Sequence, residues 1–203
     1  MTERLDNVAV AGRPRDPGLD RAILSATLEL LAEVGYAKTT ISAIARRSGV
    51  ATPAIYRRWS SKEAIVEEAV FGSDDAVPPP ASGDLRTDLT AWARWFLAQI
   101  AEPSVRTAIP GLIASYQHSE GAHDKLLARW DHPIRHALIE LIVDDYPDHA
   151  AQAPTVGDEV FDLLVASTTI RGLTRGNEDA HAFCTRTADT LALIVAARFA
   201  ADA

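Results

Sequence analysis

The chain has 203 residues, of which 47% are hydrophobic and 24% are charged, a composition typical of a globular protein with one large domain or two small ones. Its one cysteine, Cys184, excludes an internal disulfide framework and cannot build a thiolate metal site alone, which fits a reducing cytoplasm. The longest unbroken apolar run, Leu191 to Ala197, is far shorter than the roughly 20 residues of a membrane helix, so we expect no membrane span and no export signal.

The formal net charge of −8 hides a difference between two parts of the chain. Residues 1–62 carry ten lysines and arginines against six acidic residues, whereas residues 63–203 carry ten against 22. Between Glu33 and Glu63 there is no acidic residue, and six basic residues fall there: Lys38, Arg46, Arg47, Arg57, Arg58 and Lys62. This stretch predicts an anionic partner.

Hydrophobic periodicity predicts four helices in the first part of the chain. The first runs from Asp16, an N-cap residue followed by proline, to Gly35. The second covers Thr40–Arg47 and stops at Ser48-Gly49. The third starts at Thr52-Pro53, because proline is tolerated only in the first turn of a helix.

A capping box predicts the start of the fourth helix, with Ser60 as the cap and Glu63 reaching back to it. The segment Gly72–Asp84 then contains three consecutive prolines and no apolar period, which is typical of a linker. We therefore expect a flexible N-terminal arm over residues 1–16, one domain over residues 17–77 and a second domain over residues 78–203.

Beyond the linker the chain again reads as helices. One apolar face runs from Leu85 to Ile100, and another runs from Leu126 to Ile142, where Pro133 should kink or split the helix. Two more helices are expected at about residues 158–172 and 179–201. No segment alternates apolar and polar residues over the length of a strand, so the predicted fold class is all-α.

The second and third helices have the ingredients of a helix-turn-helix. Gly49 allows the positive φ that a tight turn can require, and Ala45 is small enough for the two helices to cross closely. Val50 and Ile55 are expected to hold the pair against the first helix. The third helix then projects polar and small residues toward a DNA major groove, whose width accepts a helix: Thr52, Ala54, Tyr56 and Arg57.

Residues 17–77 resemble the DNA-binding domain of the TetR family of transcriptional regulators. The resemblance rests on a specific set of residues: Gly35-Tyr36, Thr39-Thr40, Ile44-Ala45, Gly49-Val50, Ala54-Ile55-Tyr56, Trp59 and Ser61-Lys62-Glu63. It implies a helix-turn-helix at about residues 40–59 with a recognition helix at about residues 51–58. It also implies a dimeric C-terminal domain that binds a small effector.

The resemblance also implies roles for single residues on the DNA. Thr40, Ser42 and Lys62 would meet phosphates, Tyr56 would touch the backbone, and three residues would face bases: Thr52, Pro53 and Ala54. Arg57 and Arg58 are also expected to contact DNA, for example at phosphates. The chain departs from many relatives at Arg57, Arg58 and Trp59, so base preference does not transfer. The alternative is that Tyr56 packs on the first helix and the arginines form a solvated face, and Trp59 is expected in the core.

Two interpretations stay open for the arm before the first helix. The arm contains Gly12-Arg13-Pro14-Arg15, a pair of arginines stiffened by proline, like those that enter narrow minor grooves. It can equally be a disordered tail, because nearby acidic residues dilute its charge.

The second domain is expected to hold the effector pocket and the dimer interface. Aromatic residues concentrate there and are candidates for lining a pocket, although each can equally belong to the core: Trp92, Trp95, Phe96, Tyr116, Trp130 and Phe161. The last two helices are the expected interface, through the apolar residues Val160, Leu164, Leu191, Ile194 and Val195 and the small residues Ser167, Ala188, Ala192 and Ala196.

Enzymatic and metal-binding interpretations find little support in the sequence. His132 and His136 are spaced like ligands on one helix face, but Pro133 lies between them and no third ligand has a recognisable spacing. No nucleophile elbow, phosphate loop or dinucleotide fingerprint is present, so we expect neither an enzyme nor a cofactor.

The sequence therefore predicts a cytoplasmic, homodimeric transcriptional regulator that binds an operator in double-stranded DNA. We expect a repressor that an unknown small-molecule effector releases from the operator. Two alternatives remain, namely a DNA-binding activator and a helical small-molecule-binding or enzymatic protein without operator binding.

Overall fold

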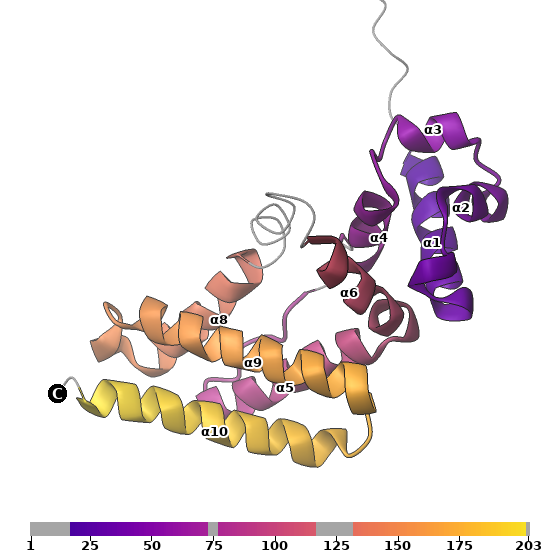
Figure 1. Cartoon of the computed structure of the whole chain (residues 1–203). Helices are drawn as coiled ribbons and strands as arrows, with labels where there is room; N and C mark the ends of the chain where they lie inside the picture. The colour runs from indigo at the N-terminus through magenta and orange to yellow at the C-terminus, as the bar shows by residue number, and fades with distance from the viewer. Residues whose placement is uncertain (1–16, 73–76, 117–131, 202–203) are drawn as a thin grey trace, which may run out of the picture.

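The computed structural model describes residues 17–72, 77–116 and 132–201, and every regular element in these ranges is a helix (Figure 1). The all-α prediction is confirmed. Helices α1 to α4 form one end of the molecule, α5 and α8 to α10 form the other, and α6 lies between them. Within the described residues, no helix is both long and apolar enough to cross a bilayer.

The first part of the chain folds into α1 (Pro17–Val34), the 3₁₀ helix η1 (Tyr36–Lys38), α2 (Ile41–Ser48), α3 (Thr52–Tyr56) and α4 (Lys62–Phe71). These elements enclose a small apolar core, to which each of the four α-helices contributes: Ile23, Leu30, Ile44, Val50, Ile55, Trp59 and Ile65. Val50 and Ile55 hold the helix pair against α1, as predicted. Trp59 lies in the core and not on the surface.

Local residues fix the ends of these helices. The Thr40 hydroxyl accepts a hydrogen bond from the Ala43 N–H and caps α2. Gly49 ends α2 in the left-handed region with φ 70°, which glycine adopts at little cost. The cap of α4 was predicted one residue too early, because the hydroxyl of Ser61, and not that of Ser60, accepts from the Ala64 N–H.

The remaining helices form the larger part of the molecule. They are α5 (Leu85–Ala101), α6 (Pro103–Tyr116), α8 (His132–Asp145), the 3₁₀ helix η3 (Pro147–His149), α9 (Ala153–Arg175) and α10 (Ala180–Ala201). Helices α5, α8, α9 and α10 share one continuous apolar core around Trp92, Phe96, Leu138 and Phe161. The predicted apolar face of α5, which runs from Leu85 to Ile100, is buried, as expected.

Two sequence predictions differ from this part of the structure, and a third falls partly on residues that are not described. Helix α9 is longer than expected, because Pro154 lies in its first turn and does not interrupt it. Pro133 lies in the first turn of α8, and the predicted kink or split at this residue stays untested, because Leu126, Leu127 and Trp130 lie outside the described residues. Helix α6 was not predicted at all.

Helix α6 escaped prediction because it contains Pro110-Gly111, a pair that normally marks a turn. Tertiary contacts keep this segment helical. Gly111 lies against the ring of Tyr36, where an added Cβ would come within 2.2 Å of Cδ1. A second small apolar cluster joins α6 to α1 and α4 through Leu31, Val66, Ala108 and Leu112.

The residues predicted for the dimer interface mostly point into the chain's own core. Val160, Leu164, Ala188, Leu191 and Val195 are all buried within the single chain. The assignment of their side chains to an intermolecular contact is therefore wrong. The apolar period of a helix shows that one face is buried, but it does not show whether the covering partner is the same chain or a second copy.

Candidate nucleic-acid interface

Helix α3 presents one side to the core and the other to solvent. Ile55 is completely buried, whereas Tyr56 on the next position is 55% exposed. Pro53 and Arg57 are exposed, and Thr52 and Ala54 are partly buried. The alternative in which Tyr56 packs on the first helix is therefore wrong, and the expected base-facing residues lie on one short, well-anchored helix.

The start of α2 lies in the same part of the molecule as α3 (Figure 1). Thr40 and Ser42 are exposed there. The first N–H groups of a helix have no partner within the helix and carry partial positive charge, which suits a phosphate oxygen. This arrangement agrees with the roles expected for these two hydroxyl residues.

The basic stretch is free of acidic residues in sequence but not in space. Arg47 forms ion pairs with Glu29 at 3.0 Å and with Glu33 at 2.6 Å, both on α1. The hydrogen bond and charge of Arg47 lower the pKa of Glu33. The guanidinium of Arg47 therefore fastens α2 to α1.

Arg58 is also held by the protein itself. Its Nε donates to the carboxylate of Asp20 on α1, and Nη1 donates to the carbonyl of Ala54 at 3.2 Å. Only 12% of the Arg58 side chain is exposed. This geometry favours a role in holding α3 against α1 over the predicted phosphate contact.

Besides the paired Arg47, three cations of the stretch are exposed: Lys38, Arg46 and Arg57. Among the residues that the structure describes, no carboxylate lies within ion-pair distance of these three side chains. Together with the α2 N-terminus they give this stretch of the chain a positive charge, which attracts a DNA backbone.

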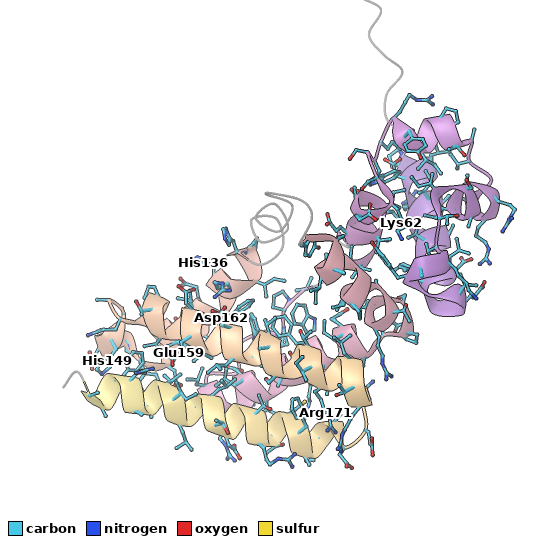
Figure 2. The ribbon with its side chains drawn as sticks, in the orientation of Figure 1. Lys62, His136, His149, Glu159, Asp162 and Arg171 are labelled. Atoms are coloured by element: carbon cyan, nitrogen blue, oxygen red, sulfur yellow. The ribbon has the colours of Figure 1, made fainter. Side chains whose placement is uncertain are left out.

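Lys62, the first residue of α4, has a defined position (Figure 2). Its Nζ lies 3.7 Å from the centroid of the Tyr36 ring and donates to the Tyr36 carbonyl at 3.3 Å. The Tyr36 hydroxyl in turn donates to Glu63 at 3.2 Å. Burial, with the Glu63 charge beside it, raises the pKa of Tyr36 to about 12, so this hydroxyl stays protonated at neutral pH.

Sequence reasoning did not find this contact group, which joins η1, α4 and α6. Tyr116 on α6 lies beside Glu67 on α4, and burial raises the pKa of both side chains. The Thr107 hydroxyl donates to the carbonyl of Leu31 at 2.8 Å. These partners are far apart in sequence, and the only signal that pointed to them was the family pattern that includes Tyr36.

Four of the six aromatic residues proposed for the effector pocket do lie together. Trp92, Trp95 and Phe96 are in mutual ring contact, and Phe161 meets Phe96 edge-on at a centroid distance of 5.7 Å. The Trp92 indole N–H is buried and has no hydrogen-bond partner among the described residues. Tyr116 packs elsewhere, beside Leu31 and Val66, and Trp130 lies outside the described residues.

Comparison with known proteins matches both parts of the chain to families. Residues 23–69 match the model described as bacterial regulatory proteins of the tetR family, and residues 79–191 match the tetracyclin repressor-like C-terminal domain. A sequence relative, an uncharacterised HTH-type transcriptional regulator of Mycobacterium bovis, is 29% identical over 81% of this chain and 83% of its own length.

Two further relatives are informative. The DNA-binding transcriptional repressor TetR of Mycobacteroides abscessus is 28% identical over 58% of this chain and 66% of its own length. A TetR variant from Acinetobacter baumannii, solved in complex with minocycline, has a TM-score of 0.56 at 20% identity and covers 91% of this chain and 96% of its own. These matches are regulators and not enzymes. The chain belongs to the TetR family of bacterial transcriptional regulators.

Proposed function

We propose that this protein acts in the cytoplasm as a homodimeric repressor that leaves its DNA operator when a small effector binds. The observation that carries the DNA-binding part is the division of α3 into a completely buried side at Ile55 and an exposed side at Tyr56 and Arg57. A helix anchored in this way can enter a major groove without rearranging. The repressor named among the relatives supports the sign of regulation.

The contacts on DNA divide by chemistry. Thr52, Pro53 and Ala54 at the start of α3 face bases, and Arg57 either reads a base or binds a phosphate. The remaining contacts are to the backbone and come from Thr40, Ser42, Tyr56 and Lys62. Arg58, paired with Asp20, contributes by fixing α3 and not by touching DNA.

The dimer forms through the outer faces of α9 and α10, which lie side by side (Figure 1). Large apolar side chains are exposed there: Leu163 and Ile170 on α9 and Leu193 on α10. An open groove of about 370 Å³ between α8 and α9 is lined in part by Val165, Ala166 and Ile170. A twofold arrangement would bury these surfaces and pair two recognition helices on one operator.

The effector binds in the domain of residues 78–203, beside the aromatic group of Trp92, Trp95, Phe96 and Phe161. Trp92, Phe96 and Phe161 are themselves buried in the core, so the effector would lie against this group, and the single unpartnered indole N–H of Trp92 suits an apolar molecule that carries a hydrogen-bond acceptor. The structural neighbour that was solved in complex with minocycline supports a small-molecule ligand for this fold.

Fluorescence anisotropy with DNA fragments tiled over the region upstream of the gene tests operator binding. We expect one fragment to bind far more tightly than a random-sequence duplex. Arg57→Ala should lower the affinity for that fragment, while Arg175→Ala, an exposed substitution at the end of α9, serves as the control. Equal, weak affinity for every duplex would contradict the proposal.

Effector release is tested in two steps. A thermal-shift screen finds compounds that stabilise the protein, and operator affinity is then measured with each of them. A ligand changes operator affinity only by its differential affinity for the two states, typically 5- to 150-fold. If every tight binder left operator affinity unchanged, the protein would not be a ligand-released regulator.

A further inference from the structure

Tyr36 lies where the DNA-binding end of the molecule meets α6. It belongs to η1, the short element between α1 and α2, and it immediately precedes the helix-turn-helix. Its ring and its carbonyl both contact the Lys62 ammonium, and its hydroxyl donates to Glu63.

Helix α6 holds the Tyr36 ring closely. A Cβ built on Gly111 would lie 2.2 to 2.5 Å from three ring atoms, so the two residues are in contact only because Gly111 has no side chain. The Thr107 hydroxyl donates to the Leu31 carbonyl one turn earlier on α6, and Leu112 is buried against Leu31. Helix α6 therefore cannot shift or rotate without moving the ring of Tyr36.

The same residue holds the ammonium of Lys62. The ring lies 3.7 Å from Nζ, a favourable cation–π distance, and the Tyr36 carbonyl accepts one of its N–H groups. A lysine ammonium has three donors, so at least one remains for a phosphate oxygen. An otherwise mobile four-carbon side chain is thus placed before DNA arrives, which reduces the entropy lost on binding.

We infer that Tyr36 is a positioning residue that places the Lys62 ammonium for a DNA phosphate, and that α6 sets the position of Tyr36 through Gly111. The phosphate part of this inference rests on the proposed DNA binding. A displacement of α6 by an effector would then loosen a backbone contact that is independent of base sequence. An effector would then regulate DNA affinity by weakening the phosphate contact of Lys62, in addition to any change in the distance between the two recognition helices of the proposed dimer.

The first experiment observes the contact without DNA. The chain has only three lysines, Lys38, Lys62 and Lys125, so protein labelled with ¹³C-lysine gives a simple spectrum of Hε signals. Lys62→Arg identifies the Lys62 signal. We expect this signal to be displaced upfield by the Tyr36 ring current, to stay displaced in Tyr36→Phe, and to lose the displacement in Tyr36→Leu.

The link to α6 is tested in the same spectra. Gly111→Ala should change the shift of the Lys62 signal, because the added Cβ displaces the ring. Ile113→Ala, an exposed substitution two residues further along α6, is the matched control and should leave it unchanged. An unshifted Lys62 signal in the wild type, or one that Gly111→Ala does not alter, overturns the inference whatever the protein does with DNA.

The second experiment measures affinity for a random-sequence duplex over a range of salt concentrations. Lys62→Ala should reduce the slope of log affinity against log salt by about 0.9, the value for one released counterion. Tyr36→Leu should reduce the slope in part, Tyr36→Phe should not, and Tyr36→Leu should have no further effect in Lys62→Ala.

The tyrosine pair separates positioning from a general loss of structure. Phenylalanine keeps the ring and the carbonyl that hold Nζ and loses only the hydroxyl bond to Glu63, so its normal slope supports positioning. An unchanged salt slope in Tyr36→Leu would overturn the positioning role. So would an equal loss of affinity when Tyr36→Leu is made in the wild type and in the Lys62→Ala variant. If the wild type binds no duplex even at low salt, both the proposed function and the phosphate role fail, while the spectra still decide the link between α6, Tyr36 and Lys62.

Discussion

The two ends of the molecule reach their stability by different routes. The DNA-binding end has a small apolar core from residues close together in the chain, Ile23 to Ile65, and adds ion pairs from α1 to Arg47 and Arg58. The other end has a large core drawn from helices that are far apart in sequence, between Leu85 and Phe199. The proposed recognition surface is therefore built locally, while the proposed effector and dimer surfaces depend on long-range packing.

The largest expected effect compares two neighbouring leucines of α10. Leu191 is 3% exposed and Leu193 is 70% exposed. Leu191→Asp buries a charge in the core and should cost at least about 3 kcal/mol of unfolding free energy. Leu193→Asp should keep the fold but remove self-association, which we would measure by light scattering and by the loss of the concentration dependence of Tm.

Two outcomes for this pair of variants would contradict the prediction. Equal destabilisation by the two variants at one protein concentration would mean that the outer face of α10 is not a separate surface. A dimeric Leu193→Asp protein would remove this face from the interface.

A smaller effect separates two neighbouring arginines at the DNA-binding end. Arg58→Ala leaves the carboxylate of Asp20 without its partner and should cost about 1–3 kcal/mol in urea unfolding. Arg57→Ala, at an exposed position, should change stability by no more than about 0.5 kcal/mol yet lower duplex affinity. Asp20→Asn should lose much of the unfolding free energy that Arg58→Ala loses. If Arg58→Ala were as stable as the wild type, the Arg58–Asp20 ion pair would not stabilise the fold.

Two glycines test whether the same backbone strain has different consequences in the two regions. Gly49 has φ 70° and Gly83 has φ 84°, and neither has a neighbour that an added Cβ would meet. Alanine at either position should cost about 1–2 kcal/mol for conformational reasons alone. Only Gly49→Ala should also weaken DNA binding, measured by anisotropy, because only that turn sets the angle between α2 and α3.

The smallest expected effect concerns two carboxylates of α4 with opposite shifts. Burial raises the pKa of Glu67 and outweighs the opposite influence of the neighbouring Tyr116 hydroxyl. Burial also acts on Glu63, but hydrogen bonds from its own backbone N–H, Ser61 and Tyr36 outweigh it and lower the pKa. A raised carboxyl pKa gives stability that is present at low pH and lost as the pH rises, and a lowered one gives stability that is lost as the pH falls.

Glutamine variants should therefore move Tm in opposite directions at pH 7. Glu67→Gln removes a partly buried charge and keeps an acceptor for Tyr116, so it should stabilise by less than about 1 kcal/mol, since solvent screens the group. Glu63→Gln should destabilise slightly. Both differences should shrink toward pH 4 in a series of thermal unfolding curves, and a shift of the same sign in both variants would contradict the assignment.

The helices, turn and core of the DNA-binding end could be predicted from the sequence in some detail. The helix starts at Pro17 and Thr52, the left-handed turn at Gly49 and the core position of Trp59 all follow from short-range rules of backbone geometry, capping and periodicity. The family pattern added the expected DNA contacts, which remain predictions residue by residue. Local rules sufficed because this part of the chain folds largely upon itself.

Contacts between residues distant in sequence could be identified only from the tertiary structure. The pairing of Arg47 and Arg58 with α1, the helical state of Pro110-Gly111 and the inward direction of Leu191 each depend on a partner distant in sequence. Periodicity shows that a face is covered, and charge runs show that cations are near in sequence, but neither identifies the covering residue. That identity comes from the packing of whole helices, because side-chain contacts between helices require their relative placement.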